Sequence, residues 1–229
     1  MKHVLLAVIF LVLAVFTAAQ IPGWQWAVTA GGIYADHAQG VAADADGNTY
    51  ITGFFSNVGT FGTLTLSSHG SYDIFVAKYD SQGNVVWAVG AGGSSTDQAK
   101  AIACDYDGNV FITGYITDSV YFGDKVISTA GGQDVFVAKL NSSGTWLWVN
   151  TGGGLANDTA QSLALDDSGN IYVAGVSSGS GTYGAYTTSV FGAMDILVAK
   201  LDSSGTWLWA DTAGGSFDDK CQAIVFDSR

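Results

Sequence analysis

The sequence predicts an all-β protein built from repeated four-stranded antiparallel sheets, the blades of a β-propeller. Three observations support this: the chain repeats every 61 residues without a gap, it has 31 glycines and one proline, and tight turns join its strand-like runs. Such a period indicates one supersecondary unit that is copied to share a core. One tryptophan and a following glycine pair mark each copy. They are Trp26, Trp87, Trp148 and Trp209, and the glycine pairs 31–32, 92–93, 153–154 and 214–215.

Each copy contains four short runs that are typical of β-strands. The first run, 39–43, is joined to the second, 50–54, by the turn at 44–48. Asp-Gly-Asn between apolar runs favours a hairpin, because these residues adopt positive φ at low cost. The third and fourth runs, 73–79 and 85–89, complete an antiparallel meander. The runs recur at 100–104, 111–115, 134–140 and 146–150, and at 161–165, 172–176, 195–201 and 207–211.

The long segment between the second and third runs, residues 55–72 in the first copy, has room for an extra small hairpin. This explains a repeat longer than the roughly 40–50 residues of commoner propeller repeats. Apolar residues occupy both faces of the third run, as in Asp73–Lys78, which predicts sheets packed on both sides. Blades arranged around an axis satisfy that demand. A β-solenoid is the alternative, although its coils lack distinct hairpin turns.

The residues from Gly31 to Trp87 resemble the bacterial β-propeller repeat known as SBBP. The resemblance is carried by Gly-Gly-x3-Asp, Asp-Gly-Asn followed by Tyr-Ile-Thr-Gly, Asp-Ile-Phe-Val-Ala-Lys and the closing Gly-Asn-Val-Val-Trp. Similar runs recur twice, and the third copy departs at Ser168 and at Val173 and Ala174. The resemblance implies a propeller in exported bacterial proteins, usually an interaction module of a larger polypeptide. It implies no catalytic residues.

Residues 1–19 have the features of a secretory signal peptide. Lys2 supplies a positive charge, Val4–Phe16 is an unbroken apolar run, and small residues at 17–19 allow cleavage before Gln20. The apolar run has 13 residues, whereas a membrane-spanning helix needs about 20. We therefore expect a secreted or cell-surface protein with no stable membrane span after cleavage. An uncleaved anchor is the alternative.

The mature chain, residues 20–229, is expected to hold an outer strand, three full blades and the start of a fourth. The expected bounds are 20–30 for the outer strand, 31–91, 92–152 and 153–213 for the blades, and 214–229 for the partial blade. The position equivalent to Lys200 lies beyond Arg229, so the ring does not close within this sequence. We expect an open fragment of a longer protein. A natural open array and an oligomer that completes the ring are the alternatives.

The composition limits the class of partner. The formal net charge is −12, with 8 lysines and arginines against 20 aspartates and glutamates. So few cations cannot neutralise a phosphate backbone, which argues against a nucleic-acid partner. The two cysteines, Cys104 and Cys221, occupy different repeat positions, so we expect no disulfide between them.

The acidic hairpin turns contain the candidate metal ligands. In the first turn, Asp44, Asp46 and Asn48 offer oxygen ligands at alternate positions, as at the start of a calcium loop. No glutamate closes the loop, so a plain hairpin turn without a cofactor is the favoured interpretation, with calcium as the alternative. The full candidate set is Asp44, Asp46, Asn48, Asp105, Asp107, Asn109, Asp166 and Asn170.

Charged and aromatic residues that recur in every copy are expected to be structural. A charge held at the same place in each blade needs an ion-pair partner or backbone hydrogen bonds. Tryptophans spaced i and i+2 are expected on one strand face, buried between blades, although a sugar-stacking platform is the alternative. The recurring residues are Asp36, Asp97, Asp158 and Asp219, with Lys78, Lys139 and Lys200, and the tryptophan pairs are 24 and 26, 146 and 148, 207 and 209.

No catalytic residues are predicted. A sialidase-type propeller needs an arginine cluster, and Arg229 is the only arginine. The predicted function is an exported non-enzymatic scaffold for interaction or adhesion with an extracellular protein or glycan. Its binding loops are expected between blades, at 31–37, 92–98, 153–159 and 214–220. The alternative is a fragment of a propeller-fold hydrolase or lyase whose active site lies beyond residue 229.

Overall fold

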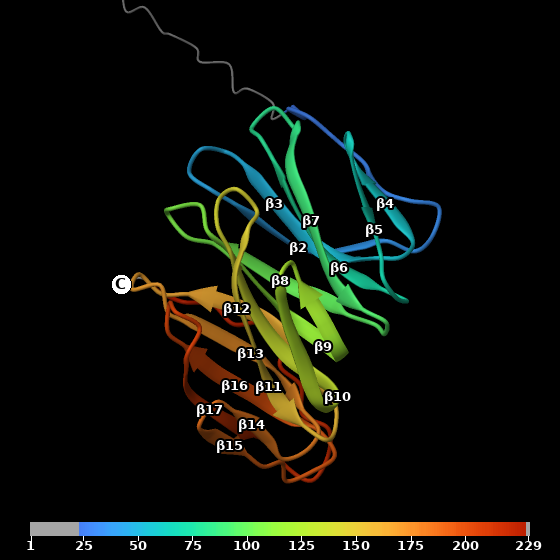
Figure 1. The fold of residues 1–229 in the computed structure, drawn as a ribbon. Helices are drawn as coiled ribbons and strands as arrows, with labels where there is room; N and C mark the ends of the chain where they lie inside the picture. Colours follow the sequence, from blue (N-terminus) through green and yellow to red (C-terminus); the bar gives the residue numbers. More distant parts are fainter. Residues whose placement is uncertain (1–22, 228–229) are drawn as a thin grey trace, which may run out of the picture.

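A computed structural model describes residues 23–227 and shows three four-stranded antiparallel sheets that fan out one after another (Figure 1). Hydrogen bonds join the first two of these, together with the small hairpin of the third blade, into one ten-stranded sheet, and the last is a separate four-stranded sheet. Fanned blades agree with the propeller prediction and contradict the solenoid alternative, in which coils form one linear stack. The predicted signal peptide, 1–19, lies outside the described residues. Within residues 23–227, no helix is long and apolar enough to cross a membrane.

Each blade is a meander whose strands pair in chain order. Blade 1 contains β2 (His37–Ala43), β3 (Thr49–Phe55), β6 (Asp73–Tyr79) and β7 (Val85–Gly93). Blade 2 contains β8 (Gln98–Cys104), β9 (Val110–Phe122), β10 (Lys125–Leu140) and β11 (Trp146–Gly154). Blade 3 contains β12 (Asp158–Leu165), β13 (Ile171–Ser177), β16 (Asp195–Leu201) and β17 (Trp207–Ala213). All twelve predicted strands lie within these bounds.

The predicted extra hairpin forms a second, smaller sheet in each blade. In blade 1 it is β4 (Val58–Phe61) with β5 (Leu64–Ser67), and in blade 3 it is β14 (Gly181–Tyr183) with β15 (Tyr186–Thr188). In blade 2 the hairpin is continuous with the long strands β9 and β10. A two-residue strand, β1 (Ala30–Gly31), pairs with β4.

Two of the four glycine pairs, 92–93 and 153–154, lie wholly in strands, which corrects their placement in the loops between blades. Gly31 ends β1, whereas Gly32 and the pair 214–215 lie outside strands, as predicted. Gly92 and Gly93 end β7 and pair with the small hairpin of blade 2, and Gly153 and Gly154 end β11 and pair with β14. The fourth strand of one blade thus crosses into the next blade's small sheet. Glycine is required there, because a Cβ on Gly93 would lie 2.1 Å from the Ser119 carbonyl oxygen.

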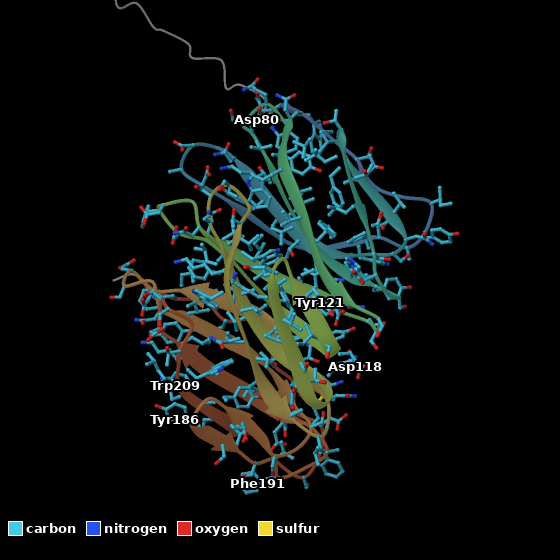
Figure 2. The ribbon with its side chains drawn as sticks, in the orientation of Figure 1. Asp80, Asp118, Tyr121, Tyr186, Phe191 and Trp209 are labelled. Atoms are coloured by element: carbon cyan, nitrogen blue, oxygen red, sulfur yellow. The ribbon has the colours of Figure 1, made fainter. Side chains whose placement is uncertain are left out.

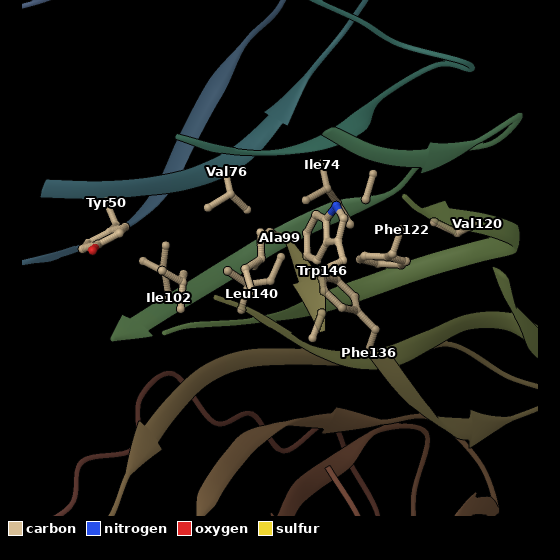
Figure 3. Packing of buried hydrophobic residues seen from close by; sticks show 14 of the residues in the cluster. Tyr50, Ile74, Val76, Ala99, Ile102, Val120, Phe122, Phe136, Leu140 and Trp146 are labelled. Carbon is tan, nitrogen blue, oxygen red and sulfur yellow. The ribbon is translucent and has the colours of Figure 1, made fainter. Parts of the chain in front are cut away.

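The main core lies between the blades. Tyr50 and Val76 of blade 1 pack against Ile112, Phe136 and Leu140 of blade 2, all of them buried (Figure 3). A second cluster joins blades 2 and 3, with members from β10, β13 and β16. Neighbouring residues of β10 therefore serve different clusters. This confirms the prediction that the third strand is apolar on both faces.

The register tryptophans have equivalent surroundings. Each indole lies against the glycine of the next blade's turn between its third and fourth strands, and an added Cβ on that glycine would come within 2.8 Å of the ring. Such equivalence is expected for copies of one sheet around a common axis. The pairs are Trp26 with Gly83, Trp87 with Gly144, and Trp148 with Gly205.

The tryptophan pairs do not share a strand face, which corrects the sequence prediction. Leu140 pairs with Trp146 and Lys139 with Trp148, so Leu147 is the extra residue of a β-bulge. A bulge reverses the alternation of side chains along the strand. Trp146 therefore packs in the cluster between blades 1 and 2, whereas Trp148 packs against the cluster between blades 2 and 3. Burial between blades holds for Trp146, which is 7% exposed.

Candidate functional site

The meander places connections at two opposite ends of the blades. We call turn face the end that carries the hairpin turns at 44–48, 105–109 and 166–170 and those at 80–84, 141–145 and 202–206. We call loop face the end that carries the small hairpins and the inter-blade loops at 32–36, 94–97 and 155–157. Both ends can be followed in Figure 1. Because strands in a meander alternate in direction, all connections of one kind collect at one end.

The first turn of each blade is closed by its leading aspartate. In blade 1, Asp44 Oδ1 accepts the backbone N–H groups of Asp46 and Asn48, at 3.1 and 2.9 Å. Its Oδ2 accepts the Asn48 side-chain amide at 2.7 Å and the Tyr50 hydroxyl at 2.9 Å. Burial alone would raise the pKa of Asp44, but these hydrogen bonds and the charge of Lys78 outweigh it, and the pKa lies below its ordinary value. Both carboxylate oxygens are used within the hairpin.

The three first turns converge around one cavity of about 580 Å³ on the turn face. Among residues 23–227, no group of three or more His, Cys, Asp or Glu side chains is placed to hold a metal ion. The plain-turn interpretation therefore stays a prediction, with calcium as its alternative. Of the candidate ligands, Asp44, Asp105, Asp107, Asn109 and Asp166 line this cavity, whereas Asp46, Asn48 and Asn170 are not in its lining.

Two recurring lysines form ion pairs on the turn face, and the third does not. Lys78 Nζ lies 3.8 Å from Asp44 Oδ2, and Lys200 lies 3.6 Å from Asp166. All three lysines lie over the aromatic ring of the second strand, and Lys139, 4.8 Å from the centre of the Phe111 ring, has this contact without an ion pair among residues 23–227 and lines the cavity. Phe111 stands where the other blades carry a tyrosine whose hydroxyl reaches the turn aspartate. The structural role expected for the lysines thus takes two forms.

On the loop face, the recurring aspartates of the Gly-Gly-x3-Asp motif close the inter-blade loops. Asp97 Oδ2 accepts the Gly93 N–H at 2.9 Å, and its Oδ1 accepts the Thr117 N–H at 2.8 Å. Asp158 accepts the Gly154 N–H at 2.9 Å. The same bond joins Asp36 to Gly32 and Asp219 to Gly215. This confirms the expected backbone-bonded role.

A second series of buried aspartates was missed in the sequence. Asp73, Asp134 and Asp195 begin the third strands, are at most 2% exposed, and each accepts a backbone N–H four residues earlier. Oδ1 of each has no hydrogen-bond partner. The signal was present, because these residues also recur at 61-residue steps. The local sequence around each aspartate predicts a strand but does not show that the carboxylate is buried.

In two of the pairs the first glycine, Gly153 or Gly214, separates two carboxylates. An added Cβ on Gly153 would lie 2.4 Å from Asp134 Oδ1 and 2.9 Å from Asp158 Oδ2. Burial raises the pKa of Asp134 to about 6, and repulsion by Asp158 adds to the increase. Burial also raises the pKa of Asp97 to about 6, with Asp73 among the contributing charges. The blade junctions thus hold carboxyl groups that bind protons more readily than usual.

The loop face carries large exposed apolar side chains. Ile33 is 91% exposed, Leu155 86%, Phe217 83% and Phe191 78%. The first three occupy the middle of inter-blade loops, and Phe191 lies between β15 and β16. Figure 2 labels Phe191 on this side of the array and Asp80 at the opposite end of blade 1. Within residues 23–227, neither Cys104 nor Cys221 forms a disulfide.

Comparison with known proteins agrees with this architecture. A family model described as the SBBP β-propeller repeat matches residues 87–122 and 151–181. The chain is similar to this repeat over these two segments. They span the end of blade 1 with the first half of blade 2, and the corresponding part of blade 3. The predicted resemblance to the SBBP repeat and the all-β propeller-like fold are thereby confirmed, whereas bacterial origin and secretion stay predictions.

Two curated relatives are much longer than the chain. An uncharacterized WD repeat-containing protein of Acanthamoeba polyphaga mimivirus is 33% identical over 82% of the chain and 16% of its own length. The regulatory protein FlaEY of Caulobacter vibrioides is 26% identical over 92% of the chain and 24% of its own length. The chain therefore spans less than a quarter of either relative. The repeat match and the WD-repeat name of the first relative are consistent with a β-propeller scaffold.

Proposed function

We propose that the chain is a non-enzymatic, exported β-propeller scaffold that binds an extracellular protein or glycan through its loop face. The observation that carries the proposal is the exposure of Ile33, Leu155 and Phe217 in the middle of three of the four Gly-Gly-x3-Asp loops. Large apolar side chains gathered on one surface of a soluble protein mark a contact with a partner. A hydrogen bond from a glycine N–H to an aspartate carboxylate closes each of these loops. The residues that vary from one loop to the next are therefore held on a rigid frame.

A photo-cross-linking residue placed at position 217 or 33 tests the binding face in the producing cells. The matched control is position 106 on the turn face, where Tyr106 is 99% exposed. We expect defined adducts from 217 and 33, identified by mass spectrometry, and none from 106. Equal labelling from the two faces, or no adduct from the loop face, contradicts the proposal.

Export is tested separately by following where the chain accumulates. Full-length chain and a variant that lacks residues 1–19 are compared by fractionation and N-terminal sequencing. We expect the full-length chain outside the cytoplasm with a new N-terminus at Gln20, and the shortened chain inside. An intact N-terminus on a cytoplasmic product contradicts export.

A further inference from the structure

A second cavity, of about 320 Å³, opens on the loop face where blades 2 and 3 meet. Its walls come from the small hairpin of blade 2, the end of β11 and the start of β14. Polar wall residues are Ser128, Thr129, Asp134, Thr151, Ser180 and Thr182. Small-molecule sites have volumes of about 300–1,000 Å³, so this cavity suits a small ligand.

A departure from the repeat creates the space. Ala130 in the cavity wall occupies the position of His69 in blade 1 and of Phe191 in blade 3. In blade 1 the histidine ring lies against the equivalent aspartate, with Nδ1 3.1 Å from Asp73 Oδ2. At the junction of blades 1 and 2 the place of Thr182 is taken by Tyr121, whereas blade 1 also carries a threonine there, Thr60, so Ala130 is the departure from the repeat. A residue that differs from its counterparts in the other repeats is better explained by a role at that one place than by a structural requirement of every blade.

The cavity wall offers hydrogen-bonding groups and no cation. Its side chains provide hydroxyl groups and one carboxylate, and the backbone of Gly152–Gly154 lines it as well. Asp134 is 2% exposed, and its Oδ1 has no hydrogen-bond partner among residues 23–227. Asp73 and Asp195 share this unpartnered Oδ1, but of the three it is Asp134 that lines this cavity. A buried acceptor without a partner costs about 1–3 kcal/mol, which a donating ligand or water would recover.

The wall chemistry selects among ligand classes. An anionic ligand has no lysine, arginine or histidine to pair with in the lining. A metal ion would find a single carboxylate there, and the described residues hold no group of three metal-binding side chains. Short hydroxyl-bearing side chains and a carboxylate match a neutral ligand that carries several hydroxyl groups, because each can donate and accept.

We propose that this cavity binds a saccharide unit, with Asp134 accepting hydrogen bonds from the sugar hydroxyl groups. Ser180 and Thr182 line one side of the bound sugar, and Leu155 covers it from the rim, where its side chain is 86% exposed. This deepens the proposed function by naming the ligand of one place on the loop face, and it therefore rests on that proposal.

The test uses methyl glycosides of glucose, galactose, mannose and N-acetylglucosamine at millimolar concentrations, with saturation-transfer NMR and calorimetry as readouts. Two variants block the cavity with residues that the other repeats carry, Ala130→His and Thr182→Tyr. We expect at least one glycoside to bind the native chain and each variant to lose about tenfold or more in affinity, equivalent to about 1.4 kcal/mol.

The matched control is Thr60→Tyr, the same exchange at the position of blade 1 that corresponds to Thr182. Its affinity should stay within about twofold of the native value, and thermal melts should show all three variants folded. The saccharide assignment is overturned if no glycoside binds, if blocked variants bind like the native chain, or if calcium alone occupies the cavity. Those results leave cross-linking at 33 and 217 unaffected, so the two proposals fail separately.

Discussion

Gly92 shows how one missing side chain determines the contact between two blades. A Cβ on this residue would lie 2.1 Å from Cγ of Asp73. A Cβ on Gly90, two residues earlier, would have its nearest neighbour at 3.6 Å. The other repeats carry Thr151 and Thr212 at that position. Both glycines belong to β7, so they share backbone context and differ in the space beside them.

Gly92→Ala should therefore lower the free energy of unfolding by at least about 2 kcal/mol, because the added methyl group displaces a buried carboxylate. Gly90→Ala should change it by less than about 0.5 kcal/mol or stabilise slightly. Urea denaturation of both variants checks this pair. Equal effects would show that the close approach to Asp73 carries no energetic weight.

The buried junction carboxyl groups predict a pH dependence. Burial raises the pKa of Asp97 to about 6 from an ordinary 3.8, and the nearby carboxylates of Asp73 and Asp118 contribute. Burial similarly raises the pKa of Asp134 to about 6. The native state then holds protons that the unfolded chain releases near pH 4. Their contribution is complete below about pH 4 and is lost as pH rises through about 6.

We expect the melting temperature to fall between pH 4 and pH 7, with Asp97 contributing up to about 3 kcal/mol at about 1.4 kcal/mol per pKa unit. In the Asp97→Asn variant the slope over this window should be shallower. The turn aspartates, whose pKa values lie below the ordinary value, add stability as pH rises to about 5 and so oppose this trend at its start, which makes the fall clearest between pH 5 and pH 7. Calorimetric melts across pH 4–8 provide the measurement, and a rising curve there would contradict the assignment.

At the scale of elements, the hairpins followed from local chemistry and the bulges did not. The residues Asp-Gly-Asn at 46–48 determine this turn locally, because the backbone N–H groups of Asp46 and Asn48 donate hydrogen bonds to the Asp44 carboxylate. The bulge at Leu147 depends on how Trp146 and Trp148 fill two different inter-blade cores, which no local pattern encodes. The positions of the strands could therefore be predicted from the sequence, whereas the sheet face on which each tryptophan lies could not.

The candidate sites show the same division. The turn aspartates could be named from oxygen spacing, but their convergence on one cavity requires three blades in place. The cavity beside Asp134 depends on Ala130, which is conspicuous only when it is aligned with His69 and Phe191. Comparison among the internal copies, beyond their shared motifs, was the signal that could have located it.

Blade 2 offers a test of how the first hairpin is stabilised. In blade 1 the Tyr50 hydroxyl donates to Asp44 at 2.9 Å, whereas blade 2 carries Phe111, which is 1% exposed. Phe111→Tyr should place a hydroxyl beside Asp105 and stabilise the chain by about 0.5–1.5 kcal/mol. Chemical denaturation measures the gain. The reverse change, Tyr50→Phe, should cost a similar amount, and a loss of stability in both variants would contradict the equivalence of the two turns.

At the scale of the whole molecule, each blade packs on its sequence neighbour through a separate cluster. One cluster joins blades 1 and 2, another joins blades 2 and 3, and a third lies in blade 1. Stability in such an array is approximately a sum of blade terms and nearest-neighbour interface terms. A defect at one interface should therefore remain local, in contrast to a domain with a single shared core.

Ile74→Ala and Leu197→Ala test this locality, because both residues are fully buried and belong to different clusters. Each truncation should cost about 2–5 kcal/mol at its own interface. Amide hydrogen exchange measured by mass spectrometry should show faster exchange in β2, β3 and β6 for Ile74→Ala, with β16 and β17 nearly unchanged. Leu197→Ala should give the opposite pattern. If either variant raised exchange evenly across all three blades, the array would unfold as one cooperative unit and the nearest-neighbour description would be wrong.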